Sequence, residues 1–516
     1  MSKQSFVQGA LILFIAGIFV KFAGFIFQII VIRIIGTEAV GLYNMIFPLY
    51  ITAIVLSTAG LPLAISKMVS HYIALGSYRA AIRVFKVALS LIIILSLTFT
   101  LLLVIISPML IKTLYKDPRV VWCFYAMVPG IIIVPICSAF RGFFQGLQDM
   151  VPPAFTQCIE QITRITIAIF LITTLKPYGI KIVAVGLSLS MIIGELFGLF
   201  TIYILYKLRR RKLRFSLGKN EYQKLTVPTK KIITELFKFG FPATLTRLIS
   251  SLVLTFEASL IPISLQKSGF TINQAASIYG QFSGVSMTLL TIPTVLTFSL
   301  ATSLLPAISE AEAQGKFAAL QFRSTESLRL TYLFGLPMAI ILLLKATSLS
   351  NILFNLPEAG TTIRFLAWGA IFLYLAQTSN GILQGLGLVD KVLINTIIGS
   401  CIKLLGIIYL VKIPELNING AAVAFVLSFL IICILNLSII HKATGFRLKI
   451  KQIILPFIAV LFMGGIIIIQ TKYYIGYFSE VFTTITSISV GLLLYFILII
   501  IFKQFSIKQF LQQTKK

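Results

Sequence analysis

Long apolar runs separated by short polar segments fill almost the whole chain. A hydrocarbon core about 30 Å thick needs roughly 20 apolar residues in a helix that rises 1.5 Å per residue, and each run is close to that length. The runs predict fourteen membrane spans, at approximately 8–32, 43–65, 85–106, 120–140, 153–174, 182–206, 237–261, 277–305, 328–349, 363–384, 392–412, 418–440, 453–470 and 483–502. We therefore expect an all-α integral membrane protein with about 14 transmembrane helices.

The distribution of charge supports this expectation and predicts an orientation. Only 11% of the 516 residues are charged, and the net charge is +29. With the N-terminus in the cytoplasm, about 29 of the 44 Lys and Arg fall in cytoplasmic segments and about 11 outside, as the positive-inside rule requires. Both termini are thus predicted to be cytoplasmic. The densest basic run, 207–214, is expected to contact anionic membrane lipid rather than nucleic acid.

The residues that catalysis or metal binding would need are sparse. The five cysteines show no C-x-x-C spacing, and the two histidines, His71 and His441, both fall in expected loops. No Walker loop or dinucleotide fingerprint occurs in the sequence. We expect no enzyme activity, no catalytic residue, no metal and no cofactor.

An internal repeat divides the chain. The sequence 142–147 (GFFQGL) returns as 381–386 (GILQGL), and at the same shift Arg164 falls on Lys403. Two parallel six-span halves are typical of transporters, which place the substrate path where the halves meet. The predicted domains are a six-helix lobe at 1–206, a basic cytoplasmic linker at 207–236, a second six-helix lobe at 237–440, and a helix pair with a basic tail at 441–516.

Ionisable side chains inside membrane spans are costly, so each one is a candidate functional residue. Four cations are predicted near mid-depth, and we expect them to line a cavity and bind substrate: Lys21, Arg164, Arg247 and Lys403. The polar residues predicted to support them are Gln28, Gln157, Glu160, Gln161, Glu195 and Ser251. Two acids against four cations leave a positive surplus, and a positive cavity favours an anion such as phosphate.

The spacing of these residues predicts stripes on the helices. Lys21 shares a face with Gly17, Gly24 and Gln28, so small residues leave room beside the cation. Glu160 precedes Arg164 by four residues, which is the spacing of an intrahelical ion pair and is equally compatible with a purely structural role.

Other parts of the same pattern stay open. Lys403 has two possible roles, which are binding substrate and forming an ion pair with Glu195. Two prolines, Pro62 in the segment 62–66 (PLAIS) and Pro306 in the segment 306–309 (PAIS), are candidate hinge or gate residues because proline removes a helix hydrogen bond.

Several segments resemble one family of transporters. These are 21–24 (KFAG), 33–43 (RIIGTEAVGLY), 60–67 (GLPLAISK), 141–146 (RGFFQG) and 157–165 (QCIEQITRI). They are similar to the stage V sporulation protein B branch of the polysaccharide transporters, within the multidrug/oligosaccharidyl-lipid/polysaccharide (MOP) exporter superfamily, which also contains the lipid II flippases. The resemblance implies a MATE-like fold of two six-helix lobes, with spans 13 and 14 shaping a groove for a lipid tail. It also implies that Lys21 matches an essential cation of the flippases, whereas Phe27 and Gln28 stand where a second cation would follow.

The expected function is export of a lipid-linked peptidoglycan precursor across a bacterial cytoplasmic membrane by alternating access. The substrate would be an undecaprenyl-pyrophosphate saccharide, with lipid II first, for cell-wall or spore cortex synthesis. A monomer that works beside cell-wall synthesis enzymes is expected. The alternative is a cation-coupled multidrug antiporter of the same superfamily, but it would need buried carboxylates, and all three aspartates, Asp117, Asp149 and Asp390, lie in expected loops. A membrane-embedded transferase and a non-transporting scaffold are the remaining readings.

Overall fold

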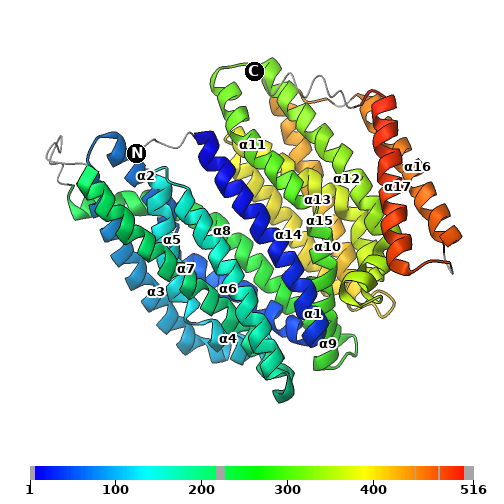
Figure 1. Cartoon of the computed structure of the whole chain (residues 1–516), viewed down its shortest axis with the longest axis horizontal. Helices are drawn as coiled ribbons and strands as arrows, with labels where there is room; N and C mark the ends of the chain where they lie inside the picture. The colour runs from blue at the N-terminus through cyan, green and yellow to red at the C-terminus, as the bar shows by residue number, and fades with distance from the viewer. Residues whose placement is uncertain (1–5, 217–226, 448, 475–476, 505–516) are drawn as a thin grey trace. The chain divides into compact units, whose positions relative to one another are not determined.

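The computed structural model describes residues 6–216, 227–447, 449–474 and 477–504, which form helices joined by short turns, with no strand among them (Figure 1). The expected all-α fold is confirmed. The chain divides into two compact units, residues 1–266 with 270–280, and residues 267–269 with 281–516.

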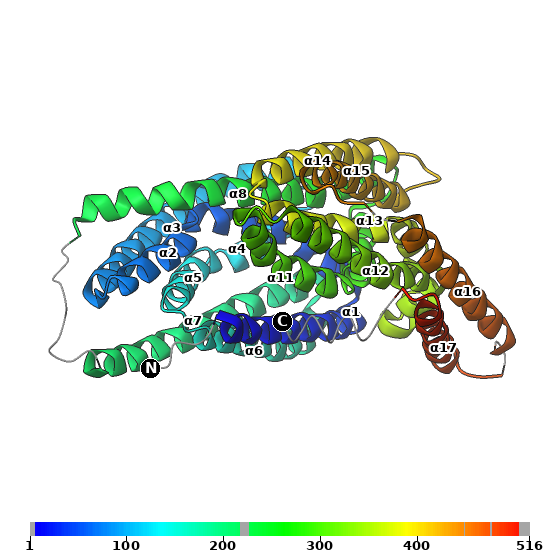
Figure 2. The same ribbon diagram turned by 90° about the horizontal axis from the view of Figure 1, so that it is seen from above.

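The described residues of the first unit form nine α-helices, and the last residue of two of them, α8 and α9, belongs to the second unit. They are α1 (Phe6–Thr58), α2 (Leu61–Ala74), α3 (Tyr78–Leu114), α4 (Val120–Met127), α5 (Gly130–Gly146), α6 (Val151–Leu175), α7 (Ile180–Ser216), α8 (Thr229–Lys267) and α9 (Ile272–Gln281). Helix α6 lies between α1 and α7 and packs against both (Figure 2). Part of the core is aromatic: the ring of Phe85 on α3 lies 4.7 Å from Phe143 on α5 and 5.3 Å from Tyr206 on α7, between ring centroids.

The second unit begins with a π-helical turn, Phe282–Ser286. Its α-helices are α10 (Met287–Thr291), α11 (Thr294–Ala313), α12 (Phe317–Phe354), α13 (Ala359–Gly385), α14 (Val389–Leu410), α15 (Ile418–Thr444), α16 (Ile450–Tyr474) and α17 (Glu480–Ile501). Helix α13 packs against α11, α12 and α15, while α16 and α17 pack against each other and against α12 (Figure 2).

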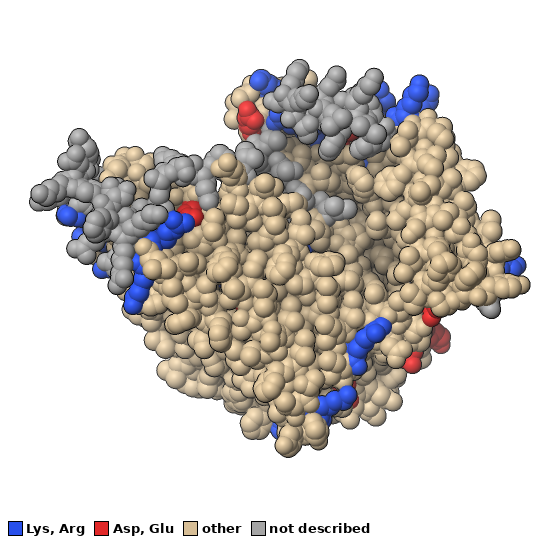
Figure 3. Space-filling view, viewed as in Figure 1, with Lys and Arg blue, Asp and Glu red and all other residues tan. Residues whose placement is uncertain are grey.

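Twelve helical stretches among the described residues are long and apolar enough to cross a membrane, so the number fourteen stays a prediction. The first stretch, Leu11–Ala74, would be about 96 Å long as a straight helix, which is far more than one crossing needs. It is interrupted at Gly36, whose φ of 75° and ψ of −177° are not helical, and again at Gly60, whose φ is 63°. These breaks allow the first two expected spans to lie within it. On the face drawn in Figure 3, the charged side chains lie toward the edges of the view, and a broad area between them is covered by other residues.

The repeated glycines have the same packing role in both units. On α5, a Cβ added to Gly142 would overlap the Pro62 carbonyl oxygen of α2, and one added to Gly146 would lie 2.7 Å from the Ser66 carbonyl oxygen. On α13, a Cβ at Gly381 would lie 2.8 Å from the Ala301 Cα of α11, and the Ser309 hydroxyl donates to the Gly385 carbonyl at 2.7 Å. Each G-x-x-x-G segment therefore lets a helix approach the backbone of its neighbour closely.

This packing places the two candidate hinge prolines. Pro62 stands in the first turn of α2, two residues after the left-handed Gly60, and its backbone contacts Gly142. Pro306 lies within α11, and its side chain is outside the described residues. The hinge or gate role of both stays a prediction.

The compact units do not separate where the sequence repeat does. The repeat predicts a second lobe from residue 237, whereas α8 belongs to the first unit almost to its end. A Cβ on Gly240 of α8 would lie 2.6 Å from the Ala59 carbonyl oxygen, and the Thr52 and Thr255 hydroxyls are hydrogen-bonded at 3.1 Å. Thus α8 follows the linker in sequence but packs with α1.

Candidate functional site

A cluster of charged side chains lies inside the first unit where α5, α6 and α7 meet. Arg141 on α5 donates from Nη2 to Glu160 Oε2 on α6 at 2.5 Å, and each side chain is less than one fifth exposed. Helix α7 approaches closely because it presents glycines: a Cβ on Gly194 would lie 2.9 Å from Arg164 Cβ, and one on Gly198 would lie 3.3 Å from Glu160 Oε2. The close packing holds the ion pair in a largely dry interior.

The predicted ion pair between Glu160 and Arg164 is wrong in its partners. Glu160 pairs with Arg141, and Arg164 donates from Nη2 to Gln161 Oε1. The i, i+4 spacing permits an intrahelical pair, but the close approach of the neighbouring helices offers Glu160 a guanidinium from α5 instead. The sequence analysis did not select Arg141 as a membrane-embedded cation, because the apolar run ends at Phe140. Helix α5, however, continues to Gly146. The signal that could have revealed it is the G-x-x-x-G segment directly after Arg141, which is typical of a helix that is still packed.

Glu195 on α7 completes the cluster. Its side chain is 8% exposed, and one carboxylate oxygen has no hydrogen-bond partner among the described residues. Its charged neighbours are Glu160, Arg141 and Arg164. Two carboxylates therefore face two guanidiniums, so the cluster is balanced when both acids are ionised and positive when one of them takes up a proton.

The Lys21 stripe on α1 faces this cluster through Gly24. A Cβ on Gly24 would lie 3.6 Å from Gln161 Nε2, and this amide nitrogen is buried without a hydrogen-bond partner among the described residues. Gly24 thus leaves the room beside the polar stripe of α6 that the sequence predicts. Lys21 itself is exposed, while Gln28 and Gln157 are half-buried.

Arg247 lies on α8 and is exposed at the surface of the protein. The small and polar residues on its stripe make contacts within the first unit: Gly240 contacts Ala59 and Gly60, directly after α1, and Thr244 Oγ1 donates to the Gly240 carbonyl of its own helix at 2.9 Å. Ser251 is buried and donates to the Leu248 carbonyl of its own helix at 3.0 Å, so its hydroxyl is occupied.

Lys403 belongs to the second unit, on α14. Its Nζ lies over the ring of Phe425 on α15, 4.7 Å from the centroid, which is a cation–π geometry. Its sequence equivalent in the repeat, Arg164, is held by an amide instead. The same unit contains a buried cation that the sequence analysis did not select: Lys345 is 2% exposed and stands at a non-helical residue of α12, with φ −111° and ψ 15°.

The structure thus brings together four of the selected residues, Glu160, Gln161, Arg164 and Glu195, and adds Arg141. Lys21 borders this group through Gly24, whereas Arg247 lies apart on α8 and Lys403 lies in the other unit. Apolar helices of membrane-spanning length around an ionic interior define a multi-pass integral membrane protein of the transporter class.

Solved structures share this fold. The structure resembles that of "Lipid II flippase MurJ, inward closed conformation", with a TM-score of 0.70 and 16% identity, covering 96% of this chain and 99% of the other. It also resembles an inward-facing multidrug resistance MATE family transporter of the MOP superfamily, with a TM-score of 0.66 and 16% identity, covering 82% and 94% of the two chains.

The sequence comparisons identify the family. Residues 6–312 match the family model of the polysaccharide biosynthesis protein, and residues 282–409 match the MatE model. The chain is 33% identical to Stage V sporulation protein B of Bacillus subtilis (strain 168), over 98% of this chain and 96% of the relative. It is 25% identical to Lipid II flippase MurJ of the same organism, over 92% and 90% of the two chains. The chain belongs to the polysaccharide biosynthesis protein family and is a membrane transporter of the MOP superfamily.

Proposed function

We propose that this transporter moves an undecaprenyl-pyrophosphate-linked saccharide, lipid II first, from the cytoplasmic to the outer leaflet. The observation that carries the proposal is the exposure of Lys21 and Arg247 on helices that are long and apolar enough to cross a membrane. A charged side chain near mid-depth is stable at the protein surface only beside water or an ionic ligand, so these cations favour a wet path for an anionic headgroup. The similarity to a lipid II flippase supports the same substrate class.

The cations are proposed to have different roles. Arg141 and Arg164 have Glu160 and Glu195 as counter-charges, so they contribute little net attraction for an anion. Lys21 and Arg247 then supply the attraction in the first unit, and Lys403 is the candidate in the second. Arg suits a diphosphate through its planar fork of donors, whereas Lys acts as a point charge.

Direction needs no nucleotide in this proposal. A membrane potential that is negative inside favours export of anionic groups by about 2.3 kcal/mol per charge per 100 mV, so a doubly charged headgroup gains roughly 4 to 5 kcal/mol. The predicted orientation, with both termini in the cytoplasm, places the basic 207–236 linker on the side from which the substrate is taken.

The polyprenyl tail is proposed to follow α16 and α17, which have no counterpart in the sequence repeat. An apolar groove of about 370 Å³ runs along α16, and its lining includes Leu461, Phe462 and Ile469. Because this groove is open on the outer surface of the second unit, a chain can stay in contact with lipid while the headgroup crosses.

The test is translocation of fluorescent lipid II in reconstituted vesicles, measured by its accessibility to a reagent outside. Lys21→Ala and Arg247→Ala should each abolish translocation while leaving the protein folded, and Lys21→Arg should retain part of it because the charge remains. Lys181→Ala is the control, since Lys181 is a helix-end cation that lies over the ring of Trp122. Full translocation by both alanine variants would refute the proposal. An altered drug-resistance profile on deletion, with precursor export intact, would favour the multidrug antiporter.

A further inference from the structure

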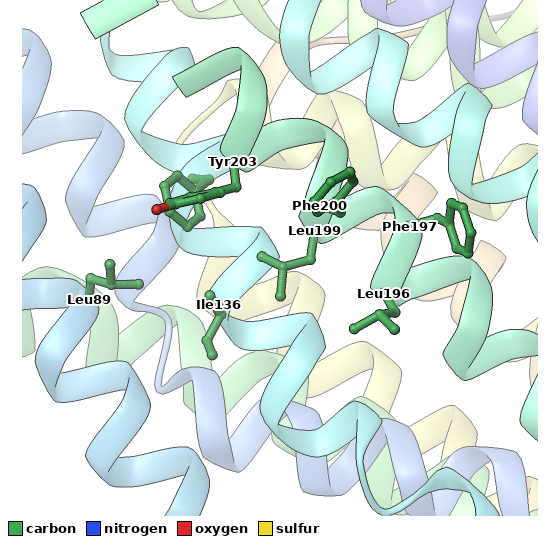
Figure 4. Close-up of a pocket in the computed structure, with 8 residues that line it drawn as sticks. Leu89, Ile136, Leu196, Phe197, Leu199, Phe200 and Tyr203 are labelled. Atoms are coloured by element: carbon green, nitrogen blue, oxygen red, sulfur yellow. The ribbon is translucent and has the colours of Figure 1, made fainter. Parts of the chain in front are cut away.

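An apolar groove of about 650 Å³ lies on the first unit, and none of the ionic cluster residues line it (Figure 4). Helix α5 forms its floor with Ile136 and Phe140, α3 contributes Leu89, and α7 forms the longest wall. The α7 residues are Leu196, Phe197, Leu199, Phe200 and Tyr203. Several of these side chains are more than two fifths exposed, so the groove is open to its surroundings along one side.

Aromatic rings close the groove at one end. The rings of Phe85 on α3 and Tyr206 on α7 lie 5.3 Å apart between centroids, and Phe140 packs edge-on against Tyr206 at 5.2 Å. Helices α3 and α7 are therefore in contact at Phe85 and Tyr206. Away from this contact, toward Leu196, they leave the groove open over α5. The positive-inside distribution of charge assigns the closed end to the cytoplasmic side.

Two lysines stand on the walls at the closed end. Lys207 follows Tyr206 on α7, and its Nζ lies over the ring of Tyr203, 4.8 Å from the centroid. Lys86 follows Phe85 on α3, is exposed, and shares a helix face with Leu89 because the two are three residues apart. Each apolar wall thus ends in a cation.

The length of the groove matches one leaflet. Leu196, Phe200, Tyr203 and Lys207 form one stripe on α7 with spacings of four, three and four residues. Eleven residues of helix span about 16 Å, which is close to half of a hydrocarbon core of about 30 Å. A chain that begins at the lysines would reach the bilayer centre at the far end of the groove.

We propose that this groove is a binding site for an anionic phospholipid of the cytoplasmic leaflet, with an acyl chain along α7 and the phosphate between Lys86 and Lys207. Charge complementarity selects the headgroup, since both cations stand where a leaflet phosphate lies. A polyprenyl substrate tail fits less well because it is much longer than one leaflet and must follow its headgroup to the other side. The site is independent of the transport proposal, which uses Lys21, Arg247 and α16.

The test measures dissociation constants of phosphatidylglycerol and phosphatidylcholine with matched acyl chains, by native mass spectrometry of the purified full chain. Phosphatidylglycerol should bind more tightly. Lys86→Gln together with Lys207→Gln should weaken it about 30-fold, at roughly fivefold per lysine, and leave phosphatidylcholine unchanged. Lys112→Gln is the matched control, because Lys112 is an exposed lysine in the last turn of the same helix, α3, at its opposite end.

A second variant tests the groove itself. Leu196→Trp fills the wall and should weaken both lipids at least tenfold, whereas Ile204→Trp, an exposed α7 position outside the groove lining, should leave both unchanged. All substitutions are at exposed positions, so size-exclusion profiles should match that of the unaltered protein. Unchanged phosphatidylglycerol binding in the double lysine variant or in Leu196→Trp would overturn the proposal. It would also be overturned if undecaprenyl phosphate displaced phosphatidylglycerol with higher affinity and the same sensitivity to Leu196→Trp.

Discussion

Replacing Arg141 by methionine should destabilise the protein more than most single substitutions. The guanidinium lies 2.5 Å from Glu160, and both side chains are less than one fifth exposed. Methionine keeps most of the apolar volume but leaves Glu160 buried without its partner, and Glu195 loses the same neighbouring cation. Removing one member of a buried ion pair costs about 3 to 5 kcal/mol, because the remaining charge is uncompensated.

The double variant separates the loss of charge balance from the loss of packing. Glu160→Gln removes the stranded carboxylate, so Arg141→Met with Glu160→Gln should be more stable than Arg141→Met alone by about 1 to 3 kcal/mol. Glu195 and Arg164 then remain as one acid and one base. The free energy of unfolding can be followed by circular dichroism in mixed micelles of a denaturing and a mild detergent.

An exposed pair of opposite charges provides the control. Lys391 Nζ and Asp390 Oδ2 are 3.8 Å apart in the first turn of α14, and their side chains are 50% and 64% exposed. Lys391→Met should cost less than about 1 kcal/mol, since solvent screens the remaining aspartate. If the effects of Arg141→Met and Glu160→Gln add to within about 0.5 kcal/mol, the two charges are not coupled and this reasoning fails.

Three further outcomes follow from single contacts. Gly142→Ala should cost about 1 to 3 kcal/mol in thermal unfolding, because the new Cβ meets backbone, whereas Gly24→Ala should cost less than about 1 kcal/mol, because its Cβ meets an amide at an ordinary 3.6 Å. Arg119→Met should cost about 3 kcal/mol by leaving Asp117, which is 3% exposed, without its bidentate partner. Hydrogen bonding to Asp117 raises the pKa of Arg119, so alkaline buffer should not reproduce that loss. Lys403→Gln should slow lipid II translocation, and Lys403→Arg should restore it, since either cation can lie over an aromatic ring.

The sequence predicts the helices well because their cause is local. Runs of apolar residues of membrane length become helices whatever their neighbours are, since the backbone must satisfy its own hydrogen bonds in lipid. The ends of the runs are less informative. Arg141 lies just beyond an apolar run, yet α5 continues past it and buries it in part. Lys345 lies near the end of another run, yet α12 continues past it and buries it almost completely.

Ion partners are harder to predict because they depend on contacts between helices. The spacing of Glu160 and Arg164 is a property of one helix, whereas the pairing of Glu160 with Arg141 depends on how closely α5, α6 and α7 approach. Gly194 and Gly198 set that approach from α7. A sequence shows these glycines but not which backbone they face, so it indicates close packing without identifying the partner.

The balance of charge in the first unit distinguishes two roles for its cations, which are holding helices together and attracting an anion. The sequence alone shows only that the cations are predicted at a similar depth. A buried arginine with a carboxylate at 2.5 Å can hold helices together, but it cannot also attract a diphosphate without breaking that pair. An exposed cation has the opposite properties: it contributes little to packing, and water screens it enough that a bound anion can leave again. The proposed flippase activity needs both, because the lobes must stay rigid while the headgroup is bound and released in each cycle. On this reasoning, substitutions at Arg141 should act on stability and those at Lys21 or Arg247 on transport.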